Sequence, residues 1–263
     1  MKNEFYKPYK LLVLDIDSTL LDNNDMISQN SLEALKAITE KGIAITLATG
    51  RFFNDASCFA KKLEISSPMI VLHGAQIKSV DGAILKEVAL TPGIVVNLIN
   101  IARKMNLAFQ AFQDNCLLIE KRNKWHNLYI KHSCQSPEII YVNDITLYLK
   151  NKIIQFSFLG EKSDLRRLKE LIKKQMGDKI SIACSHDNLL DIVGPNVNKG
   201  TALIELADIL KISVSEIIAI GDNYNDIEMI KIAGLGVAMG NAPSEVKDAA
   251  DFVTKDNNNE GIA

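Results

Sequence analysis

The sequence predicts an α/β protein whose doubly wound, Rossmann-like parallel-sheet core is interrupted by an inserted α+β domain. At both ends of the chain, apolar runs of strand length alternate with amphipathic segments of helix length. This alternation is typical of a parallel sheet covered by helices on both faces. In the middle of the chain, a hairpin signal and consecutive strands break the alternation, which indicates a separate unit.

The core elements follow from hydrophobic periodicity. Leu11–Leu14 is a buried-strand pattern, while Leu32, Leu35 and Ile38 recur at helical spacing. The same reasoning predicts strands over 11–14, 43–48, 69–72, 217–220, 236–239 and 252–254. It predicts helices over 31–40, 52–63, 201–210, 226–232 and 242–249.

The middle of the chain follows a different pattern. Val80-Asp81-Gly82 contains the Asp-Gly pair that is typical of a hairpin turn. Strands are predicted over 77–79, 84–87, 107–112, 116–120, 152–158 and 180–183, with helices over 94–105 and 163–175. We therefore expect a first core part at 1–82, an inserted α+β domain at 83–186 and a second core part at 187–263.

Composition excludes several classes of protein. The 263 residues carry a formal net charge of −2, with 47% hydrophobic and 24% charged residues, which is ordinary globular usage. The near-neutral charge gives no general attraction to nucleic acid. Residues 1–10 are polar, and no apolar run approaches the roughly 18 residues that a membrane span needs. We expect a cytoplasmic protein, monomer or homodimer, with no membrane or nucleic-acid partner and with reduced, scattered cysteines.

Two carboxylates follow the first predicted strand. Asp15 and Asp17 stand at i and i+2, so they point to the same side of an extended chain. At the carboxyl edge of a parallel sheet they lie where such sheets bind ligands. Like charges this close repel each other unless a cation neutralises them or one carboxylate is protonated. The pair suits covalent catalysis in which one carboxylate attacks and the other transfers a proton. The simpler alternative is that one of them caps the next turn.

A second acidic strand end strengthens the catalytic interpretation. Asp222 follows the strand over 217–220, and Asn225 and Asp226 open the next helix. Hard oxygen ligands from two strand ends suit Mg²⁺. Capping of the helix by Asn225 and Asp226 is an alternative that is compatible with ligand binding.

Two further segments suit an anion. Thr49-Gly50-Arg51 ends a predicted strand, where a hydroxyl and free backbone amides form an anion cradle. Lys199 begins a predicted helix, where its charge opposes the helix dipole. That misfit favours a lysine held for an anion, although a single lysine is usually a solvated side chain.

The four segments together resemble a known family. In order they read LLVLDIDSTLLD, LATGR, NKGTAL and GDNYNDIEM, and they span nearly the whole chain. This arrangement resembles the haloacid dehalogenase-like (HAD) phosphohydrolases, and among them the Cof-type branch with a large α/β cap between the second and third motifs. Members of the family commonly continue into one more helix after the segment that here reads EGIA.

The resemblance implies a role for each matching position. Asp15 would be the nucleophile that forms an aspartyl-phosphate, and Asp17 the acid and base. Residues expected to hold the phosphoryl group are Thr49, Gly50, Arg51, Lys199 and Asn225. Residues expected to hold Mg²⁺ are Asp15, Asp17 through its backbone carbonyl, Asp222 and Asp226, the last as a ligand or through a water.

Two positions depart from the family's pattern. Ser18 stands where the first motif usually has glycine, so the turn is expected to be strained or to adopt another conformation. His73 stands where the family commonly has asparagine before Gly-Ala. We interpret His73 as a hydrogen-bonded residue at a strand end, with a phosphate contact as the alternative.

The sequence thus predicts a Mg²⁺-dependent phosphomonoesterase that acts on small phosphorylated metabolites, with sugar phosphates as the leading class. A phosphomutase of the same superfamily is one alternative, and a non-catalytic sugar-phosphate sensor is another. The intact set of Asp15, Asp17, Asp222 and Asp226 disfavours the sensor.

Overall fold

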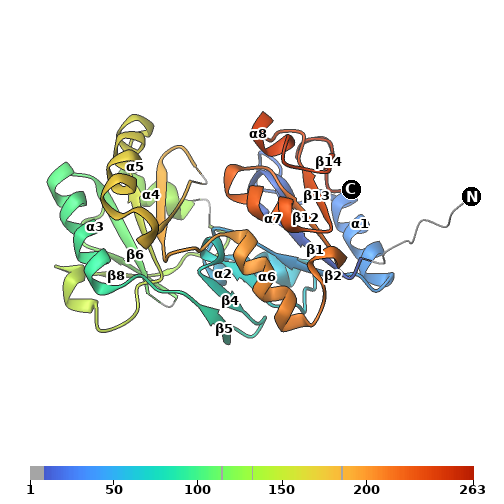
Figure 1. Ribbon diagram of the computed structural model, residues 1–263, viewed down its shortest axis with the longest axis horizontal. Helices are drawn as coiled ribbons and strands as arrows, with labels where there is room; N and C mark the ends of the chain where they lie inside the picture. The colour runs from blue at the N-terminus through green and yellow to red at the C-terminus, as the bar shows by residue number, and fades with distance from the viewer. Residues whose placement is uncertain (1–8, 114, 132, 185) are drawn as a thin grey trace, which may run out of the picture.

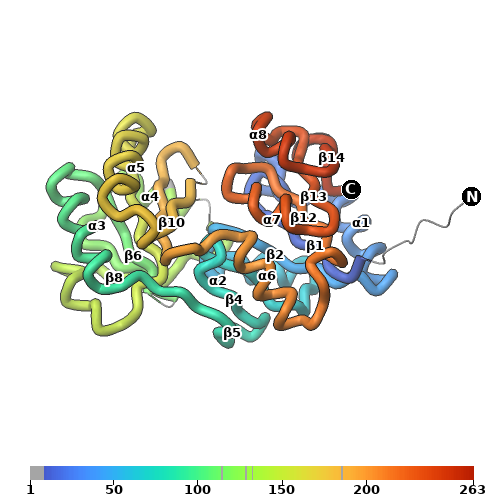
Figure 2. The backbone as a smooth tube through the Cα atoms, in the orientation of Figure 1, coloured from blue at the N-terminus to red at the C-terminus, as the bar shows by residue number. Residues whose placement is uncertain are grey.

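The computed structural model describes residues 9–113, 115–131, 133–184 and 186–263. Figure 1 shows two modules side by side, with the first and last parts of the chain both in the right-hand module. We call the right-hand module the core and the left-hand one, built on a six-stranded sheet, the insert. The tube in Figure 2 follows the chain from the core into the insert beyond β5 and back again before α6.

The core is built on a parallel five-stranded sheet in the order β14-β13-β12-β1-β2. Its strands are β1 (Leu11–Leu14), β2 (Ala44–Leu47), β12 (Ile217–Gly221), β13 (Leu235–Ala238) and β14 (Phe252–Val253). Its helices are α1 (Gln29–Glu40), α2 (Phe53–Lys62), α6 (Lys199–Leu210), α7 (Ile227–Ile232) and α8 (Ser244–Lys247). The predicted doubly wound α/β core is therefore confirmed.

Alternation along β1 explains why helices cover both faces of this sheet. Leu12 and Leu14 pack in one apolar cluster with residues of α1 and α2. Leu11 and Val13 pack in another cluster with residues of α6 and α7. Because successive side chains of a strand point to opposite faces, a strand buried on both sides needs the continuous apolar run that 11–14 provides.

A small antiparallel sheet joins the two modules. It comprises β3 (Met69–Val71), β4 (Gln76–Lys78) and β5 (Ile84–Glu87). A parallel bridge between Ala48, just after β2, and Ile70 of β3 links this sheet to the core sheet. The predicted hairpin between β4 and β5 is confirmed, and Gly82 in its turn has a positive φ of 91°.

The insert carries a six-stranded sheet in the order β10-β11-β9-β6-β7-β8. Its strands are β6 (Ala108–Gln113), β7 (Cys116–Ile119), β8 (Glu138–Tyr141), β9 (Gln155–Leu159), β10 (Ser181–Ala183) and β11 (Leu189–Val193). Its helices are α3 (Pro92–Met105), α4 (Lys124–Lys131) and α5 (Lys162–Met176). Neighbouring strands are antiparallel except β7 and β8.

Several elements of the insert differ from the sequence-based expectation. The elements α4, β8 and β11 were not predicted. Pairing of β11 with β9 places Leu189–Val193 in the insert sheet, although the predicted boundary assigns these residues to the second core part. All five residues of this strand are buried, so the strand has no alternation of buried and exposed residues. Pairing with its neighbours determines the sheet to which it belongs.

The cysteines differ as well. Cys58 on α2 of the core and Cys134 in the insert form a disulfide, so the expectation of reduced thiols is wrong for this pair. The bond ties the insert to the core on the side of α2. Among the described residues, no helix has both the length and the apolar character needed to cross a membrane.

Candidate active site

Asp15 lies where β1 leaves the core sheet. Its backbone N–H still donates to the carbonyl of Ile220 at 3.0 Å, which fixes the position of the residue against β12. The chain then turns sharply, and Ser18 takes a positive φ of 59°. A non-glycine residue in this region is strained. The strained turn that we expected at Ser18 is therefore the one observed.

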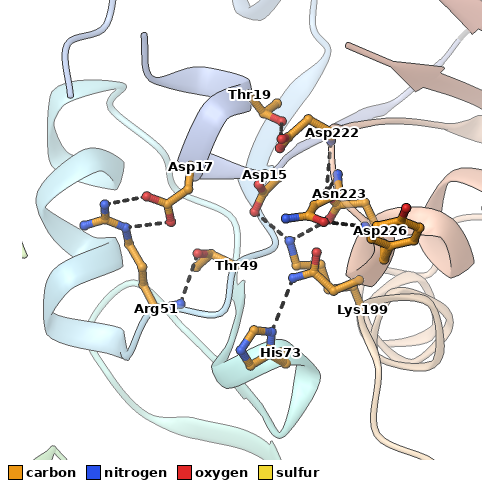
Figure 3. A network of polar contacts seen from close by, with 12 residues as sticks. Asp15, Asp17, Thr19, Thr49, Arg51, His73, Lys199, Asp222, Asn223 and Asp226 are labelled. Carbon is orange, nitrogen blue, oxygen red and sulfur yellow. Dashed lines mark hydrogen bonds and ion pairs between the residues drawn. The ribbon is translucent and has the colours of Figure 1, made fainter. Parts of the chain in front are cut away.

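The carboxyl end of β12 brings Asp222 beside this turn. The hydroxyl of Thr19 donates to Asp222 Oδ1 at 2.9 Å, which links the two strand ends (Figure 3). Asp226 Oδ2 accepts the backbone N–H groups of Asp222 and Asn223, both at 3.0 Å. A Cβ on Gly221 would lie 2.5 Å from Asp226 Cγ, so only glycine allows Asp226 to fold back in this way. The capping alternative therefore holds for Asp226. Its carboxylate also belongs to an acidic cluster with those of Asp15 and Asp222.

Lys199, the first residue of α6, lies between two of these carboxylates. Its Nζ is 2.6 Å from Asp15 Oδ1 and 2.6 Å from Asp226 Oδ1, and the residue is only 1% exposed. Burial alone lowers the pKa of Lys199, but the charges and hydrogen bonds of the two carboxylates outweigh it and raise the pKa above its usual value. The lysine is thus a fixed positive charge, and the alternative of a solvated side chain is excluded.

The acidic cluster carries more negative charge than Lys199 compensates. Burial raises the pKa of Asp15 well above its usual value, since the opposing effect of Lys199 is offset by Asp226, Asp222 and Asp17. Burial and the charge of Asp226 raise the pKa of Asp222 to about 7. One oxygen from each of Asp15, Asp222 and Asp226 lies within 4.8 Å of the others. Such a set of buried oxygens favours a divalent cation.

The side chain of Asp17 points away from this cluster and binds Arg51 (Figure 3). Arg51 donates from Nε to Asp17 Oδ2 at 3.0 Å and from Nη2 to Asp17 Oδ1 at 2.6 Å. Burial raises the pKa of Asp17, but hydrogen bonds and charge from Arg51 outweigh it, and the pKa is lowered overall. The guanidinium expected to bind phosphate therefore holds Asp17 in its ionised form in this structure.

Arg51 also connects the site to the insert. Its Nη1 donates to Asp55 Oδ2 at 2.8 Å, one turn along on α2. Asp55 Oδ1 in turn accepts the backbone N–H groups of Cys134 at 2.6 Å and Gln135 at 3.2 Å. A continuous series of hydrogen bonds thus runs from Asp17 through Arg51 and Asp55 to the insert loop that carries the disulfide-bonded Cys134.

Thr49 and Gly50 lie at the end of β2, as the sequence predicted. Thr49 is fully buried, and its hydroxyl accepts the backbone N–H of Arg51 at 3.1 Å. A Cβ on Gly50 would lie 2.3 Å from Cε1 of His73. The loop can therefore pack against the histidine ring only with glycine at this position.

His73 joins three elements at this place. It is 1% exposed, its Nε2 is 2.9 Å from Asp191 Oδ2 of β11, and its Nδ1 is 3.4 Å from Asn225 Nδ2. Our interpretation of His73 as a hydrogen-bonded strand-end residue agrees with these contacts. The ring bridges core and insert, which the sequence alone did not indicate.

We expect Gly50→Ala to lower the free energy of unfolding by about 1–3 kcal/mol, as overpacking of a filled interior does. The new methyl group has to displace the buried ring of His73 and weaken its contact with Asp191. Urea unfolding measures the change. Gly93→Ala is the matched control, since no atom lies within 4 Å of a Cβ there. An unfolding free energy equal to that of the wild type in Gly50→Ala would contradict the close packing.

The site opens into a cavity of about 440 Å³ between core and insert. Its lining from the core includes Asp15, Asp17, Gly50, Arg51, Asp222 and Asn225. From the insert it is lined by Trp125, Tyr129, Ser133, Gln155, Leu159, His186, Asn188, Leu189 and Asp191. Sequence analysis did not single out Gln155, Asp191 or Asp55, because no motif surrounds them.

Comparisons with known proteins agree with this geometry. A family model described as haloacid dehalogenase-like hydrolase matches residues 12–263. The chain is 30% identical to a putative phosphatase of Haemophilus influenzae over 97% of this chain and 96% of the relative. It is 29% identical to the 5-amino-6-(5-phospho-D-ribitylamino)uracil phosphatase YcsE of Bacillus subtilis, over 97% of this chain and 93% of the relative. A crystal structure of a haloacid dehalogenase-like hydrolase from Bacteroides thetaiotaomicron superposes with a TM-score of 0.87 at 29% identity, covering 97% of both chains.

Proposed function

Because the chain belongs to the haloacid dehalogenase-like hydrolases and is a phosphatase of the Cof type, we propose that it hydrolyses small phosphate monoesters through an aspartyl-phosphate on Asp15. The observation that carries this proposal is the position of Lys199, buried between Asp15 and Asp226 at the meeting point of two strand ends. A buried cation beside a carboxylate that lines a cavity suits the approach of an anionic nucleophile to an anionic substrate.

Each residue has a proposed part in two in-line steps. Asp15 attacks phosphorus, the bond to the leaving oxygen breaks, and Asp17, after it has taken up a proton from solvent, gives that proton to the leaving oxygen. Asp17 then takes a proton from the water that attacks the aspartyl-phosphate, and Asp15 and inorganic phosphate are released. Thr49, Gly50, Lys199 and Asn225 would hold the phosphoryl group. Asn225 lines the cavity together with Asp15, and its amide Nδ2 is the group that can donate a hydrogen bond to a phosphoryl oxygen.

Arg51 is assigned differently from the sequence-based expectation. Its contacts with Asp17 and Asp55 support a positioning role, in which it holds the ionised carboxylate that the second step needs.

The residues present fit Mg²⁺. Asp15 and Asp222 line the cavity, whereas Asp226 is absent from its described lining and accepts hydrogen bonds from Lys199 and two backbone N–H groups. Asp15 and Asp222 are therefore the side chains best placed to ligate the ion. Asp226 would act through its charge, and the Asp17 carbonyl is the remaining expected protein ligand. When bound, the ion would neutralise charge that develops on the transferring phosphoryl group.

The substrate is proposed to be a small phosphorylated metabolite, with sugar or polyol phosphates as the leading class. The relative YcsE supports this choice, since its name places the phosphate on a ribityl chain. We extend the proposal to a cytoplasmic enzyme, monomer or homodimer, that acts without nucleic acid or membrane. A phosphomutase is the alternative on the same residues, and it would return the phosphoryl group to a sugar instead of releasing phosphate.

We expect phosphate release from p-nitrophenyl phosphate with Mg²⁺, and loss of at least about 99% of that rate when EDTA removes the ion, because metal charge supplies several kcal/mol of transition-state stabilisation. Restoring Mg²⁺ in excess of EDTA should restore the rate, which controls for damage to the protein. Full activity in EDTA would contradict the metal assignment. With a sugar phosphate as substrate, transfer of the phosphoryl group to a sugar without release of inorganic phosphate would favour the phosphomutase.

A further inference from the structure

The face of the insert sheet that meets the cavity carries polar residues in its centre. Phe156, Phe158 and Ile192 belong to the apolar cluster that includes residues of α3 and α5. Because strand side chains alternate, Gln155 and Ser157 of β9 point to the opposite face. Ser157 pairs directly with Asp191 of β11, so Asp191 shares that face.

Hydrogen bonds determine how the amide of Gln155 is oriented. Its Nε2 donates to Asp191 Oδ1 at 2.9 Å and to Ser157 Oγ at 3.2 Å. Ser157 in turn donates to the same Asp191 oxygen at 2.5 Å. Since the amide nitrogen faces two acceptors, the carbonyl oxygen Oε1 must point elsewhere.

That oxygen is a buried acceptor without a protein donor. Gln155 is 1% exposed, and its Oε1 has no hydrogen-bond partner among the described residues. Gln155 and Asp191 line the same cavity as Asp15. A buried acceptor left without a donor is costly, so a donor from a bound molecule is favoured at this place.

We propose that Gln155 is a specificity-determining residue, whose Oε1 accepts a hydrogen bond from a hydroxyl group of the substrate's leaving group. The inference rests on the proposed phosphatase function and narrows its substrate to monoesters of uncharged polyols. Asp191 and Ser157 are positioning residues, because they hold the amide so that only an acceptor faces the substrate.

The charges around the cavity agree with an uncharged leaving group. Among its described lining residues, Arg51 alone carries a guanidinium or ammonium group, and that group binds Asp17 and Asp55. A second phosphate or a carboxylate on the substrate would meet the carboxyl groups of Asp17 and Asp191 with no ammonium or guanidinium group of the wall available to it.

The test compares substrates with and without hydroxyl groups. The probes are ribitol 5-phosphate, glucitol 6-phosphate and glucose 6-phosphate, set against p-nitrophenyl phosphate and n-hexyl phosphate. In the wild type, we expect the best polyol or sugar phosphate to exceed n-hexyl phosphate in kcat/KM by at least about tenfold, as one added hydrogen bond allows. We expect fructose 1,6-bisphosphate to be a poorer substrate than that best monoester.

Gln155→Met should lower kcat/KM for the best polyol or sugar phosphate by about 10–100-fold, since methionine keeps the length of the side chain and removes the acceptor. Turnover of p-nitrophenyl phosphate should stay within about twofold, which also shows that the variant is folded. Gln110→Met is the matched control. Gln110 lies on the neighbouring strand opposite Ser157 and is buried with unpartnered amide atoms, but it is absent from the described lining of the cavity.

The outcomes separate this inference from the proposed function. No turnover of any probe by the wild type overturns both. Turnover of p-nitrophenyl phosphate without preference for a hydroxylated substrate overturns the inference alone. An equal loss on all substrates in Gln155→Met, or the same selective loss in Gln110→Met, also overturns it.

Discussion

Asp15→Asn is expected to lower the rate of phosphate release by at least about 10⁴-fold, because an amide cannot attack phosphorus and loss of a covalent nucleophile has effects of this size. The measurement is phosphate release from p-nitrophenyl phosphate with Mg²⁺. Asp81→Asn is a suitable control, since Asp81 is an exposed residue of the β4–β5 turn. Unchanged turnover in Asp15→Asn would overturn the assigned mechanism.

The same variant should keep or raise the free energy of unfolding in metal-free buffer. Burial and neighbouring carboxylates raise the pKa of Asp15 in the folded state. A raised folded-state pKa means that ionising this group costs stability as the pH rises from the unfolded-state pKa through the folded-state one. Asparagine has the same shape and never ionises. Loss of activity together with loss of stability would indicate a mainly structural role.

Lys199→Met is expected to lower the free energy of unfolding by about 3–5 kcal/mol, because it leaves buried carboxylates without their counter-charge. Asp15 and Asp226 both contact Nζ at 2.6 Å, and Asp226 is fully buried. Urea unfolding in EDTA measures this effect. Lys231→Met, at an exposed position on α7, should change stability by no more than about 0.5 kcal/mol.

Activity should fall in Lys199→Met as well, by at least about 10³-fold, because the fixed charge beside the nucleophile is lost. The double variant Asp15→Asn/Lys199→Met separates the two effects of the lysine. If the loss of stability comes from uncompensated charge, removing one carboxylate should restore part of it. A double variant no more stable than Lys199→Met would contradict this electrostatic explanation.

The core and the position of its candidate site could be predicted because their signals are local. A strand buried on both faces requires a continuous apolar run, as in Leu11–Leu14. The residues after such a strand lie at the carboxyl edge of the sheet, so Asp15 and Asp222 were expected to meet. Lys199 was recognised because a lysine at a helix start opposes the helix dipole.

The insert was harder to predict. The strand Leu189–Val193 carries Asp191 in an otherwise apolar segment, and nothing in its own sequence indicates the sheet to which it belongs. Its place depends on pairing with β9. Along the chain, α5 and β10 lie between these two strands. Strands such as β8 likewise take their place from the sheet around them, and propensity within one segment contains no information about that pairing.

The sequence by itself determined which residues lie at the candidate site, since strand ends and helix starts place them without reference to distant contacts. Only the tertiary structure decided what those residues touch. It placed Arg51 against Asp17 and Asp55, joined Cys58 to Cys134, and placed Gln155 beside Asp191 in the lining of the cavity. The physical reason is that these contacts join segments far apart in the chain. Their geometry depends on how the two modules pack together, and local hydrophobic periodicity does not describe that packing.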